Sequence, residues 1–574
     1  MTIRMTMTTT MIPRAPRFHI RSILGPSIFL LLLPLFVAAQ DCTDIQNYDF
    51  GNFTMDATLG QRVPTHWSWA VGRSLGHTNN NGQATQLLAN GRGLTLQNPI
   101  YTTQFLQLHQ FFFVDDDDDD SSTDGTHLYE LEALHVVTTG DPLDNAYVKL
   151  ATVDETTGTP EFSDQTRLIL PTFPNIVHGS LLGYLLLEAG PARQRASIFY
   201  DGQGTMSVES LCAKRIEDSR MIDALIKFIN RYYSYFNVRG PSRNDFLAQT
   251  DTIQSNVTSG DVTTLDAVQQ VLGALTRSDP HVYLVTNNDT VIPPLGFQAM
   301  ELSPLWDSSF AVPYGRLKER QTWKDGQNTL AMTGLLNMSG RRAVYFLLTS
   351  LAQDDSFYEE VSQALVQLLS QAKQYEIILD LRHNPGGDEV QGLKIMYDLL
   401  SAGSDNPSDI QSVYYATNSF RIDPEDENRF YEIQRAPVDV PVQSRTRMAV
   451  LTSRNCVSSC EGFVLALRQA GAILVGENTA GASGNPQPFL IPNVGKAYIS
   501  TWKAGDVNGV PFEASGIAAD IEVTAVVSAD DDPVLDAAVQ YMENSSETAD
   551  SASVDSQTSL VALFTFAGLV ALLL

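Results

Sequence analysis

Short apolar segments alternate with amphipathic segments between residues 343 and 475, and this alternation constrains the fold of the chain more than any other feature. The continuous apolar runs have strand length and comprise residues 343–349, 377–381, 448–453 and 473–475. The segments between them repeat apolar residues every three or four positions, over residues 361–372, 393–400 and 461–470. Strands that alternate with helices in this way predict an α/β core with a largely parallel sheet.

Two other regions precede this core. Residues 41–213 contain short β-rich runs separated by Gly, Asn, Asp and Thr, which predicts an all-β sandwich of the jelly-roll type. Within residues 214–290, apolar residues recur at helical spacing from Ile222 to Phe236 and from Leu265 to Leu275, which predicts a helical subdomain. The chain is therefore expected to be multidomain, with its α/β core over residues 291–542.

Both ends of the chain carry features of processing and targeting. Residues 1–40 combine four arginines with a leucine-rich apolar run that ends in small residues, which indicates a cleaved secretory signal peptide, with an uncleaved signal anchor as the alternative. Residues 543–559 form a spacer rich in serine and acidic residues, followed by the uncharged tail 560–574. That tail would rise only about 22 Å as a helix, which is short for a bilayer core of about 30 Å. It predicts a glycosylphosphatidylinositol (GPI) attachment signal, or otherwise a short tail anchor, on a protein held at the outer face of the plasma membrane.

The charge of the chain bears on its partners. A formal net charge of -29, from 66 acidic and 37 basic residues, argues against nucleic acid as a partner. The six consecutive carboxylates Asp115–Asp120 cannot pack in a core and therefore predict a solvated loop. A calcium site there is the less favoured alternative, because calcium ligation alternates liganding positions around a glycine turn. No metal site or cofactor is expected. Trp67 and Trp69 could form a glycan-binding platform in the β domain, although burial in its core is the commoner role of tryptophan.

Cysteines and sequons agree with an extracellular protein. The four cysteines allow three disulfide pairings. We expect Cys42 to pair with Cys212, because these two bracket one segment, and Cys456 with Cys460, because they are neighbours in the sequence. Candidate N-glycosylation sites are Asn52, Asn256, Asn288, Asn337 and Asn544, which agree with a secreted protein although each sequon alone is a common chance match.

Three loops at the carboxyl ends of predicted strands carry the residues suited to chemistry, since functional groups gather at that edge of such sheets. The loop 380–387 contains the paired glycines Gly386 and Gly387, whose bare amides can hold an oxyanion. The loop 451–461 places Ser458 between a strand and a helix, where a serine acts either as a nucleophile or as an ordinary N-cap. Ser453 and Ser459 compete for the nucleophilic role on composition alone. The third loop, 476–484, is a glycine-rich turn.

These loops, in this order, carry a family resemblance. The segments 380–387, 451–461, 475–481 and 516–521 resemble the tail-specific (C-terminal processing) serine peptidases. The resemblance extends over roughly residues 221–541 and implies a ClpP/crotonase-like core with protein or peptide substrates. One branch of the family uses a lysine base after the position of Thr479, where this chain has Ala482 and Ser483.

The other branch, which includes the tricorn protease core and the chlamydial protease-like activity factor, uses histidine with glutamate. The segments 278–281 and 513–517 resemble its histidine and glutamate motifs. The resemblance therefore implies Ser458 as nucleophile, His281 as its base and Glu513 as the carboxylate that orients His281. The amides of Gly386, Gly387 and Ser459 would form the oxyanion hole.

The sequence leaves two other functions open. The same fold also occurs in ligand carriers of the interphotoreceptor retinoid-binding type, in which case the three residues would be vestigial. A glycan-binding N-terminal domain would make the chain an adhesin. The residues favour the hypothesis that the chain is a secreted, surface-tethered serine endopeptidase that forms an acyl-enzyme on Ser458.

Overall fold

The computed structural model describes residues 190–298, 315–339, 341–370, 376–401 and most of 410–544, together with separate strands between residues 53 and 188. In the last range, residues 414–415, 424, 435–437, 442–446 and 529 are excluded. The predicted signal peptide, the tail beyond residue 544, Cys42, Asn52, Trp67 and the run Asp115–Asp120 lie outside the described residues. Within the described part of the chain, no helix has the length and apolar character needed to cross a bilayer.

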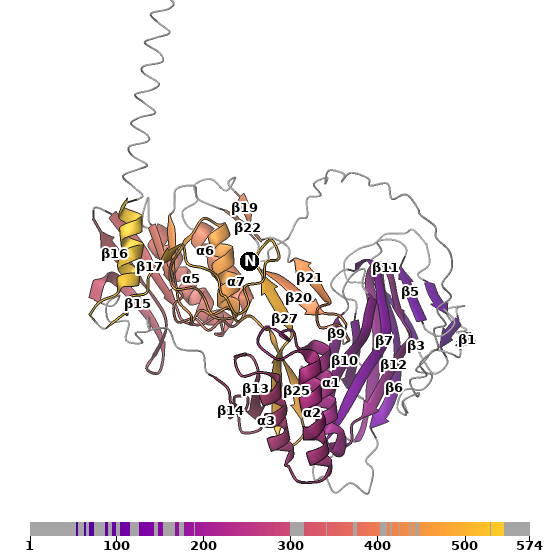
Figure 1. The fold of residues 1–574 in the computed structure, drawn as a ribbon. Helices are drawn as coiled ribbons and strands as arrows, with labels where there is room; N and C mark the ends of the chain where they lie inside the picture. Colours follow the sequence, from indigo (N-terminus) through magenta and orange to yellow (C-terminus); the bar gives the residue numbers. More distant parts are fainter. Residues whose placement is uncertain are drawn as a thin grey trace, which may run out of the picture. The chain divides into compact units, whose positions relative to one another are not determined.

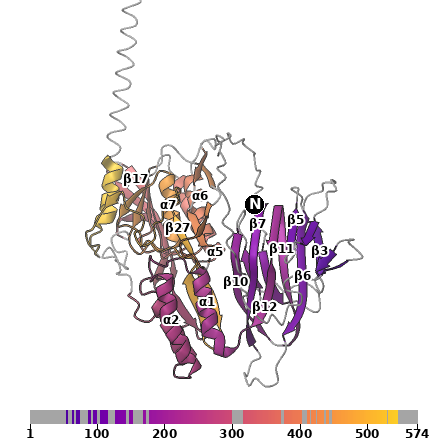
Figure 2. The ribbon, with the colours of Figure 1, turned by 45° about the vertical axis from the view of Figure 1, so that its right-hand side comes forward.

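The N-terminal region consists of antiparallel strands that form two sheets around one shared strand, β11 (Gly190–Val208). One sheet has the order β3 (Ser68–Arg73), β6 (Gln104–Val114), β11, β8 (Tyr147–Thr152) and β9 (Arg167–Pro171). The other joins β10 (Val177–Glu188), β7 (Thr126–Pro142), β12 (Ser210–Arg215), β11, β5 (Leu94–Asn98) and β4 (Gln86–Ala89). A separate hairpin pairs β1 (Phe53–Met55) with β2 (Arg62–Pro64). Figure 2 shows the long strands of this region side by side. The antiparallel pairing agrees with an all-β region, and its jelly-roll character stays a prediction.

Helices follow directly. They are the 3-10 turn η1 (Asp218–Arg220), α1 (Met221–Tyr232), α2 (Arg243–Thr258) and α3 (Thr264–Leu275). The prediction that the first helix continues to Phe236 is wrong: it ends at Tyr232, because the Ser234 amide donates to the carbonyl of Ser500 instead of continuing the helix. The pattern of apolar residues did not predict the helix α2, because few of its residues are buried. It begins at the N-cap Ser242, whose side chain accepts from the Asp245 amide, a local start signal in the sequence.

A four-stranded antiparallel sheet packs against these helices. Its order is β14 (Val291–Ile292), β13 (Tyr283–Thr286), β26 (Gly495–Ser500) and β25 (Pro486–Ile491). Phe489 and Ile499 share one buried cluster with Leu225 and Val268 of the helices. Residues nearly 270 positions apart therefore build one hydrophobic core around the segment that contains His281.

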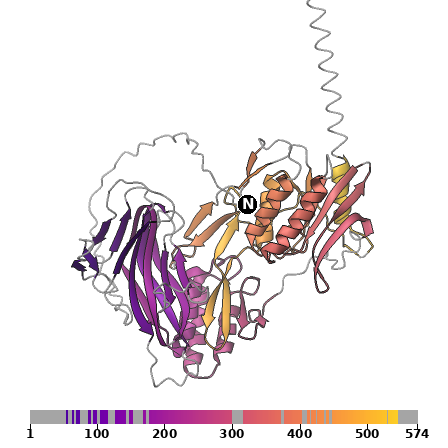
Figure 3. The same ribbon diagram turned by 180° about the vertical axis from the view of Figure 1, so that it is seen from behind.

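The central sheet has seven strands in the order β15 (Leu317–Asp325), β16 (Asn328–Met338), β17 (Arg341–Leu348), β18 (Glu376–Asp380), β23 (Met448–Thr452), β24 (Ile473–Gly476) and β28 (Ile521–Glu522). The strands from β17 to β28 are parallel, β16 is antiparallel to β17, and β15 is antiparallel to β16. Helices α5 (Asp355–Ser370), α6 (Glu389–Ser401) and α7 (Ser459–Gln469) connect the parallel strands. Figures 1 and 3 show these helices next to one another beside the sheet. The predicted alternation of strands and helices is confirmed.

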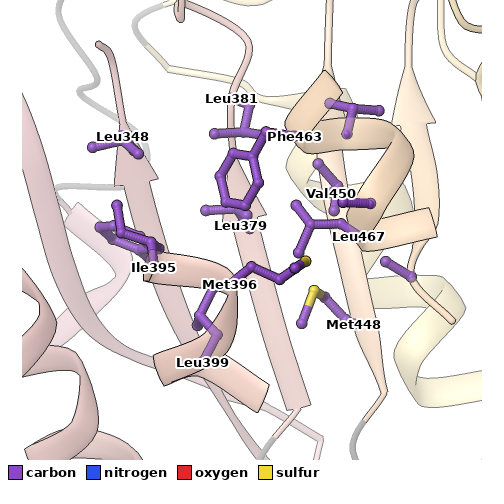
Figure 4. Packing of buried hydrophobic residues seen from close by; sticks show 14 of the residues in the cluster. Leu348, Leu379, Leu381, Ile395, Met396, Leu399, Met448, Val450, Phe463 and Leu467 are labelled. Atoms are coloured by element: carbon purple, nitrogen blue, oxygen red, sulfur yellow. The ribbon is translucent and has the colours of Figure 1, made fainter. Parts of the chain in front are cut away.

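Both faces of this sheet are buried, which explains why its strands read as continuous apolar runs. On β17, Val344, Phe346 and Leu348 belong to the cluster beneath α5 to α7, whereas Ala343, Tyr345 and Leu347 face a second cluster. The first cluster also contains Leu379, Met396 and Phe463, which interdigitate in Figure 4. The second is closed by the helical residues 533–544, through Val534, Leu535 and Ala538.

Smaller β elements complete the described chain. Strands β19 (Ile410–Val413) and β22 (Val438–Pro441) pair with each other. A three-stranded antiparallel sheet has the order β21 (Phe430–Gln434), β20 (Thr417–Arg421) and β27 (Trp502–Gly505).

A buried guanidinium connects the central sheet with the C-terminal helical segment. Arg382 is 2% exposed and donates to both oxygens of Asp380, at 3.0 and 2.6 Å, and to both oxygens of Asp532, at 2.9 Å each. The hydroxyl of Tyr345 donates to Asp380 at 2.6 Å, and Asp532 accepts the Leu535 amide at 3.0 Å. Because Arg382 begins the loop that contains the paired glycines, its position fixes the start of that loop.

We expect Arg382→Ala to lower the free energy of unfolding by about 3–5 kcal/mol, because it leaves two carboxylates buried without their cation. Chemical denaturation measures the change. The matched control is Arg468→Ala, which removes the partner of Asp520 in a pair whose side chains are 35% and 36% exposed; it should cost about 1 kcal/mol or less. Equal losses for the two variants would contradict a special role of the buried network.

Candidate active site

Ser458 occupies a strained turn between β23 and α7. Its backbone angles are φ 58° and ψ -126°, a conformation that residues with a side chain rarely adopt and that tends to persist at functional sites. A sharp strand-to-helix turn with positive φ is the geometry that exposes a nucleophilic serine in other serine hydrolases. Although Ser458 stands at the N-cap position, its side chain caps no amide of the helix. The ordinary N-cap explanation for this serine therefore does not hold.

The other two serines of the loop have structural bonds. Ser453 is fully buried and its hydroxyl donates to the carbonyl of Arg382 at 2.6 Å. The hydroxyl of Ser459 donates to the carbonyl of Gly387 at 2.6 Å. Within the described part of the chain, the hydroxyl of the half-buried Ser458 makes no hydrogen bond. Of the three candidates, Ser458 has the hydroxyl that remains available for reaction.

The predicted disulfide between Cys456 and Cys460 is present and spans this turn, with the two Cα atoms 5.5 Å apart. Backbone bonds hold the same segment, since the Val457 amide donates to Asn384 at 3.1 Å and the Ser458 amide to Ala482 at 2.8 Å. Cys212 is also disulfide-bonded, whereas its predicted partner Cys42 lies outside the described residues.

The glycine pair lies directly against this turn. Gly386 has φ 95°, and a Cβ atom added there would stand 2.7 Å from the carbonyl of Val457 and 2.9 Å from the Cβ of Ser458. Only glycine allows the two loops to come so close. The side chain of Asn384 supports the loop by accepting the Gly386 amide at 2.8 Å, so that amide is already used.

Gly387 has a different environment. It is exposed, has φ 137°, and its amide has no acceptor among the described residues. Ser459, whose amide begins α7, stands beside it through the hydroxyl bond to the Gly387 carbonyl. Gly387 and Ser459 thus lie in the loops that meet at Ser458, and the role of their amides in an oxyanion hole stays a prediction.

His281 lies at the end of a buried turn, 8% exposed. Its backbone amide donates to Asp279 at 3.0 Å, and its Nδ1 atom stands 3.8 Å from the same carboxylate, beyond hydrogen-bond distance. Its Cβ would be 3.3 Å from a Cβ added at Gly484. Burial is the main cause that lowers the pKa of His281; Asp279 raises it, and Arg239 lowers it further.

Glu513 is bound by other partners. It is 9% exposed, pairs with the guanidinium of Arg239, and accepts the Ser483 amide at 3.1 Å. Burial raises the pKa of Glu513 to about 7, against the opposing effect of Arg239. Among the described residues no hydrogen bond connects Ser458 with His281, or His281 with Glu513. Catalytic hydrogen bonds often tighten only around a substrate, and the roles of His281 and Glu513 stay predictions.

One segment nevertheless connects the three residues. Ala482 accepts the amide of Ser458, Ser483 donates to Glu513, and Gly484 stands against His281. Two steps of extended chain cover at most about 7 Å. The nucleophile, the imidazole and the carboxylate therefore border the same short stretch of backbone.

Two residues that the sequence analysis assigned no role hold this segment in place. Glu461 is fully buried and accepts the Thr479 hydroxyl at 2.6 Å and the amides of Gly481 and Ala482 at 2.6 and 2.8 Å. Burial is the main cause that raises the pKa of Glu461 to about 7. Its position three residues after the N-cap suggests a capping box, but it binds the neighbouring loop instead of its own helix.

Arg239 is the second such residue. Besides Glu513, its guanidinium donates to the carbonyls of Ser278, at 2.9 Å, and of Gly481. It thereby ties together the histidine segment, the glutamate turn and the loop that receives the Ser458 amide. Nothing in the local sequence around Arg239 indicates this, because its partners are 39 to 274 positions away.

Comparison with known proteins identifies the family of the α/β core. Residues 343–523 match the family model described as Peptidase family S41. The chain carries a serine peptidase domain of family S41. This family contains the tail-specific proteases, so the resemblance stated for the sequence is confirmed. No curated protein matches the chain.

Solved structures similar to this S41 chain are distant. A candidate peptidase from Parabacteroides merdae shares 17% identity over 57% of this chain and 96% of its own, with a TM-score of 0.43. Mature CPAF complexed with lactacystin shares 11% identity over 53% of this chain and 93% of its own, with a TM-score of 0.36. The photosystem II D1 C-terminal processing protease shares 13% identity over 55% of this chain and 95% of its own, with a TM-score of 0.32. These values are too low to transfer any site residue.

We expect Gly386→Ala to lower the rate of labelling of Ser458 by a fluorophosphonate on the order of 10²-fold, because displacement of the loop by about 1 Å misplaces the reacting groups. The rate of labelling is measured from samples quenched at successive times. Gly471→Ala is the matched control: Gly471 has nearly the same φ, 94°, but an added Cβ would meet nothing within 4 Å. It should cost about 1–2 kcal/mol of stability and leave labelling unchanged. Similar labelling by both variants would refute the close fit of the two loops.

A second expectation concerns pH. Burial disfavours the imidazolium of His281, so its pKa should lie below the ordinary value of about 6.5, and the neutral base form should persist into mildly acidic solution. NMR titration of the histidine Cε1–H signals measures this, with the His281 signal assigned by its loss in His281→Gln. In Asp279→Asn the midpoint should fall further, because the carboxylate that raises the pKa is gone. A midpoint at or above 6.5 in the unmodified protein contradicts the expectation.

Proposed function

We propose that this chain is a secreted, surface-tethered serine endopeptidase that cleaves peptide bonds through an acyl-enzyme on Ser458, with His281 as the base. One observation carries the proposal: the Ser458 hydroxyl makes no hydrogen bond with any residue that the structure describes, on a residue with φ 58°, and the glycine loop lies against it. A serine that had only a structural role would use its hydroxyl in the fold, as Ser453 does.

The residues suggest the following reaction. The Oγ atom of Ser458 attacks the carbonyl carbon of the scissile bond while its proton passes to His281. The amides of Gly387 and Ser459 donate to the oxyanion of the tetrahedral intermediate. Collapse of the intermediate breaks the C–N bond, and the leaving amine takes the proton from His281. Water, deprotonated by the same imidazole, then hydrolyses the ester on Ser458.

The surroundings of the site favour this proton path. Because burial lowers the pKa of His281, its imidazole is neutral near pH 7 and can accept a proton. The predicted partner Glu513 would stabilise the imidazolium that forms. For this the carboxylate of Glu513 must turn from Arg239 towards the His281 ring. Catalytic hydrogen bonds of this kind often form only when a substrate is bound.

Secretion and tethering are supported by features of the sequence. They are the apolar N-terminal run before residue 41 and the apolar tail 560–574 behind a serine-rich spacer. Asn288, Asn337 and Asn544 are exposed, and Asn256 is half-buried, so these four sequons offer accessible acceptors for glycans. A lipid anchor at the C-terminus would keep the domain at the outer face of the membrane.

We expect a fluorophosphonate probe to label the purified chain and to lose this label in Ser458→Ala, because the phosphorus reacts only with an activated serine hydroxyl. The control Ser453→Ala keeps Ser458 and should still be labelled. On intact cells a membrane-impermeant probe should label the same protein, and phosphatidylinositol-specific phospholipase C should release it. Folded protein that takes no label would instead support the catalytically inactive ligand-binding homologue. Label that stays with the cells after the lipase would exclude the GPI anchor.

A further inference from the structure

Lys503 has an unusual environment on β27, close to the candidate active site. The residue pairs with Ser419 of β20 in the three-stranded sheet. The two residues before it, Thr501 and Trp502, both donate their amides to the carbonyl of Gly484, at 2.8 and 3.3 Å. Gly484 ends the segment 482–484, which binds Ser458 and Glu513. The start of β27 therefore lies next to the backbone of the candidate active site.

The ammonium group of Lys503 has no anionic partner in the described part of the chain. Its Nζ atom stands 3.9 Å from the ring centroid of Phe430. It makes no hydrogen bond and no ion pair with any described residue, although the side chain is half-buried. A cation over an aromatic face is attracted to it, but an ammonium also has three protons to donate, and these remain unused.

The charged groups near Lys503 are already bound to other residues. Arg421 donates to the carbonyls of Asn230 and Tyr233. Glu427 accepts the Asn237 side chain and the Arg243 amide, both at 2.6 Å. Glu513 is held by Arg239 and Ser483. Among the described residues, the neighbouring carboxylates are therefore engaged elsewhere, and the half-buried Lys503 ammonium is left with neither a counterion nor a hydrogen-bond acceptor.

This arrangement costs stability. Burial and the nearby Arg421 lower the pKa of Lys503 to about 8, against smaller opposing effects of Glu427 and Glu513. A charged group that is disfavoured by its surroundings and bonded to nothing contributes little to holding the fold. Residues that break the rules of stable packing tend to serve function.

We propose that Lys503 determines substrate specificity by binding a carboxylate of the peptide substrate, a few residues from the scissile bond. The inference rests on the proposed peptidase function and adds its substrate class, an acidic peptide. A carboxylate would accept the unused ammonium protons and restore the missing counterion. The adjacent Arg421 favours an anion and repels cationic side chains. The carboxylate can belong to an Asp or Glu side chain or to the C-terminus of the substrate.

Binding to a protein that lacks the nucleophile tests this without catalysis. The probes are fluorescein-labelled decapeptides of a positional-scanning library, amidated at the C-terminus, that carry either Glu or Gln at each position in turn. A third set contains no acidic residue and ends in a free carboxylate. Dissociation constants are measured by fluorescence anisotropy for Ser458→Ala, alone and combined with Lys503→Met, Lys503→Arg or Lys496→Met. Lys496 is an exposed lysine of β26 and serves as the matched control.

At one or more positions, Glu peptides should bind about tenfold more tightly than Gln peptides, which corresponds to about 1.4 kcal/mol. Lys503→Met should abolish this preference, Lys503→Arg should retain it, and Lys496→Met should leave it unchanged. If the preference appears only for peptides with a free C-terminus, the carboxylate is terminal. The proposal is overturned if neither set shows a preference or if the preference survives in Lys503→Met.

Two further measurements separate this proposal from others. Lys503→Met should unfold at the same or a higher temperature than the unmodified chain, whereas a lysine with a structural role would lower that temperature when replaced. If the unmodified chain takes no fluorophosphonate label while the Ser458→Ala protein shows the carboxylate preference, the peptidase proposal fails and the Lys503 site stands. Labelling without a carboxylate preference would do the reverse.

Discussion

The strained backbone of Ser458 is the constraint on which the rest of the site depends. A residue with φ 58° persists only where its surroundings hold it. Here the amides of Val457 and Ser458 donate to Asn384 and Ala482, which belong to two different loops. A disulfide brackets the turn, and the missing side chain at Gly386 lets the glycine loop lie against Ser458. The turn is thus held by two neighbouring loops, and each of these loops needs its own support.

Buried charges supply that support. Arg382 fixes the glycine loop to the end of β18 and to the helical segment 533–544. Glu461 fixes the loop that accepts the Ser458 amide, and Arg239 fixes the glutamate turn. Each of these groups is costly to desolvate and is compensated by several charge-assisted bonds. Lys503 lacks such compensation, and for that reason it is the residue through which we infer a substrate carboxylate.

Local pattern was sufficient for the parallel strands β17, β18, β23 and β24 and for the helices between them. These strands are buried on both faces and the helices have one apolar face, so periodicity alone located them. It did not locate β15, whose side chains are largely exposed, or β16 and β28. The helix that was extended to Phe236 shows where this fails, because Tyr233 and Phe236 have helical spacing but are buried in irregular backbone. The helix α2 is present but was not predicted, since it is largely exposed and its start depends on one capping serine. The sheet formed by β13 and β25 could not be expected, since its strands are some 200 positions apart.

The sequence by itself determined which residues can do the chemistry: a serine after a buried strand, a glycine pair after another, and a histidine and a glutamate in segments that resemble one family. It also determined the α/β character of the core, because burial on both faces imposes a readable pattern. The resemblance already pointed to Ser458, but only the tertiary structure showed that the hydroxyls of Ser453 and Ser459 are bonded to backbone carbonyls, since those partners come from distant loops. It alone assigned Glu461, Arg239 and Lys503 their surroundings, because burial and charge compensation depend on residues that meet only when the chain has folded.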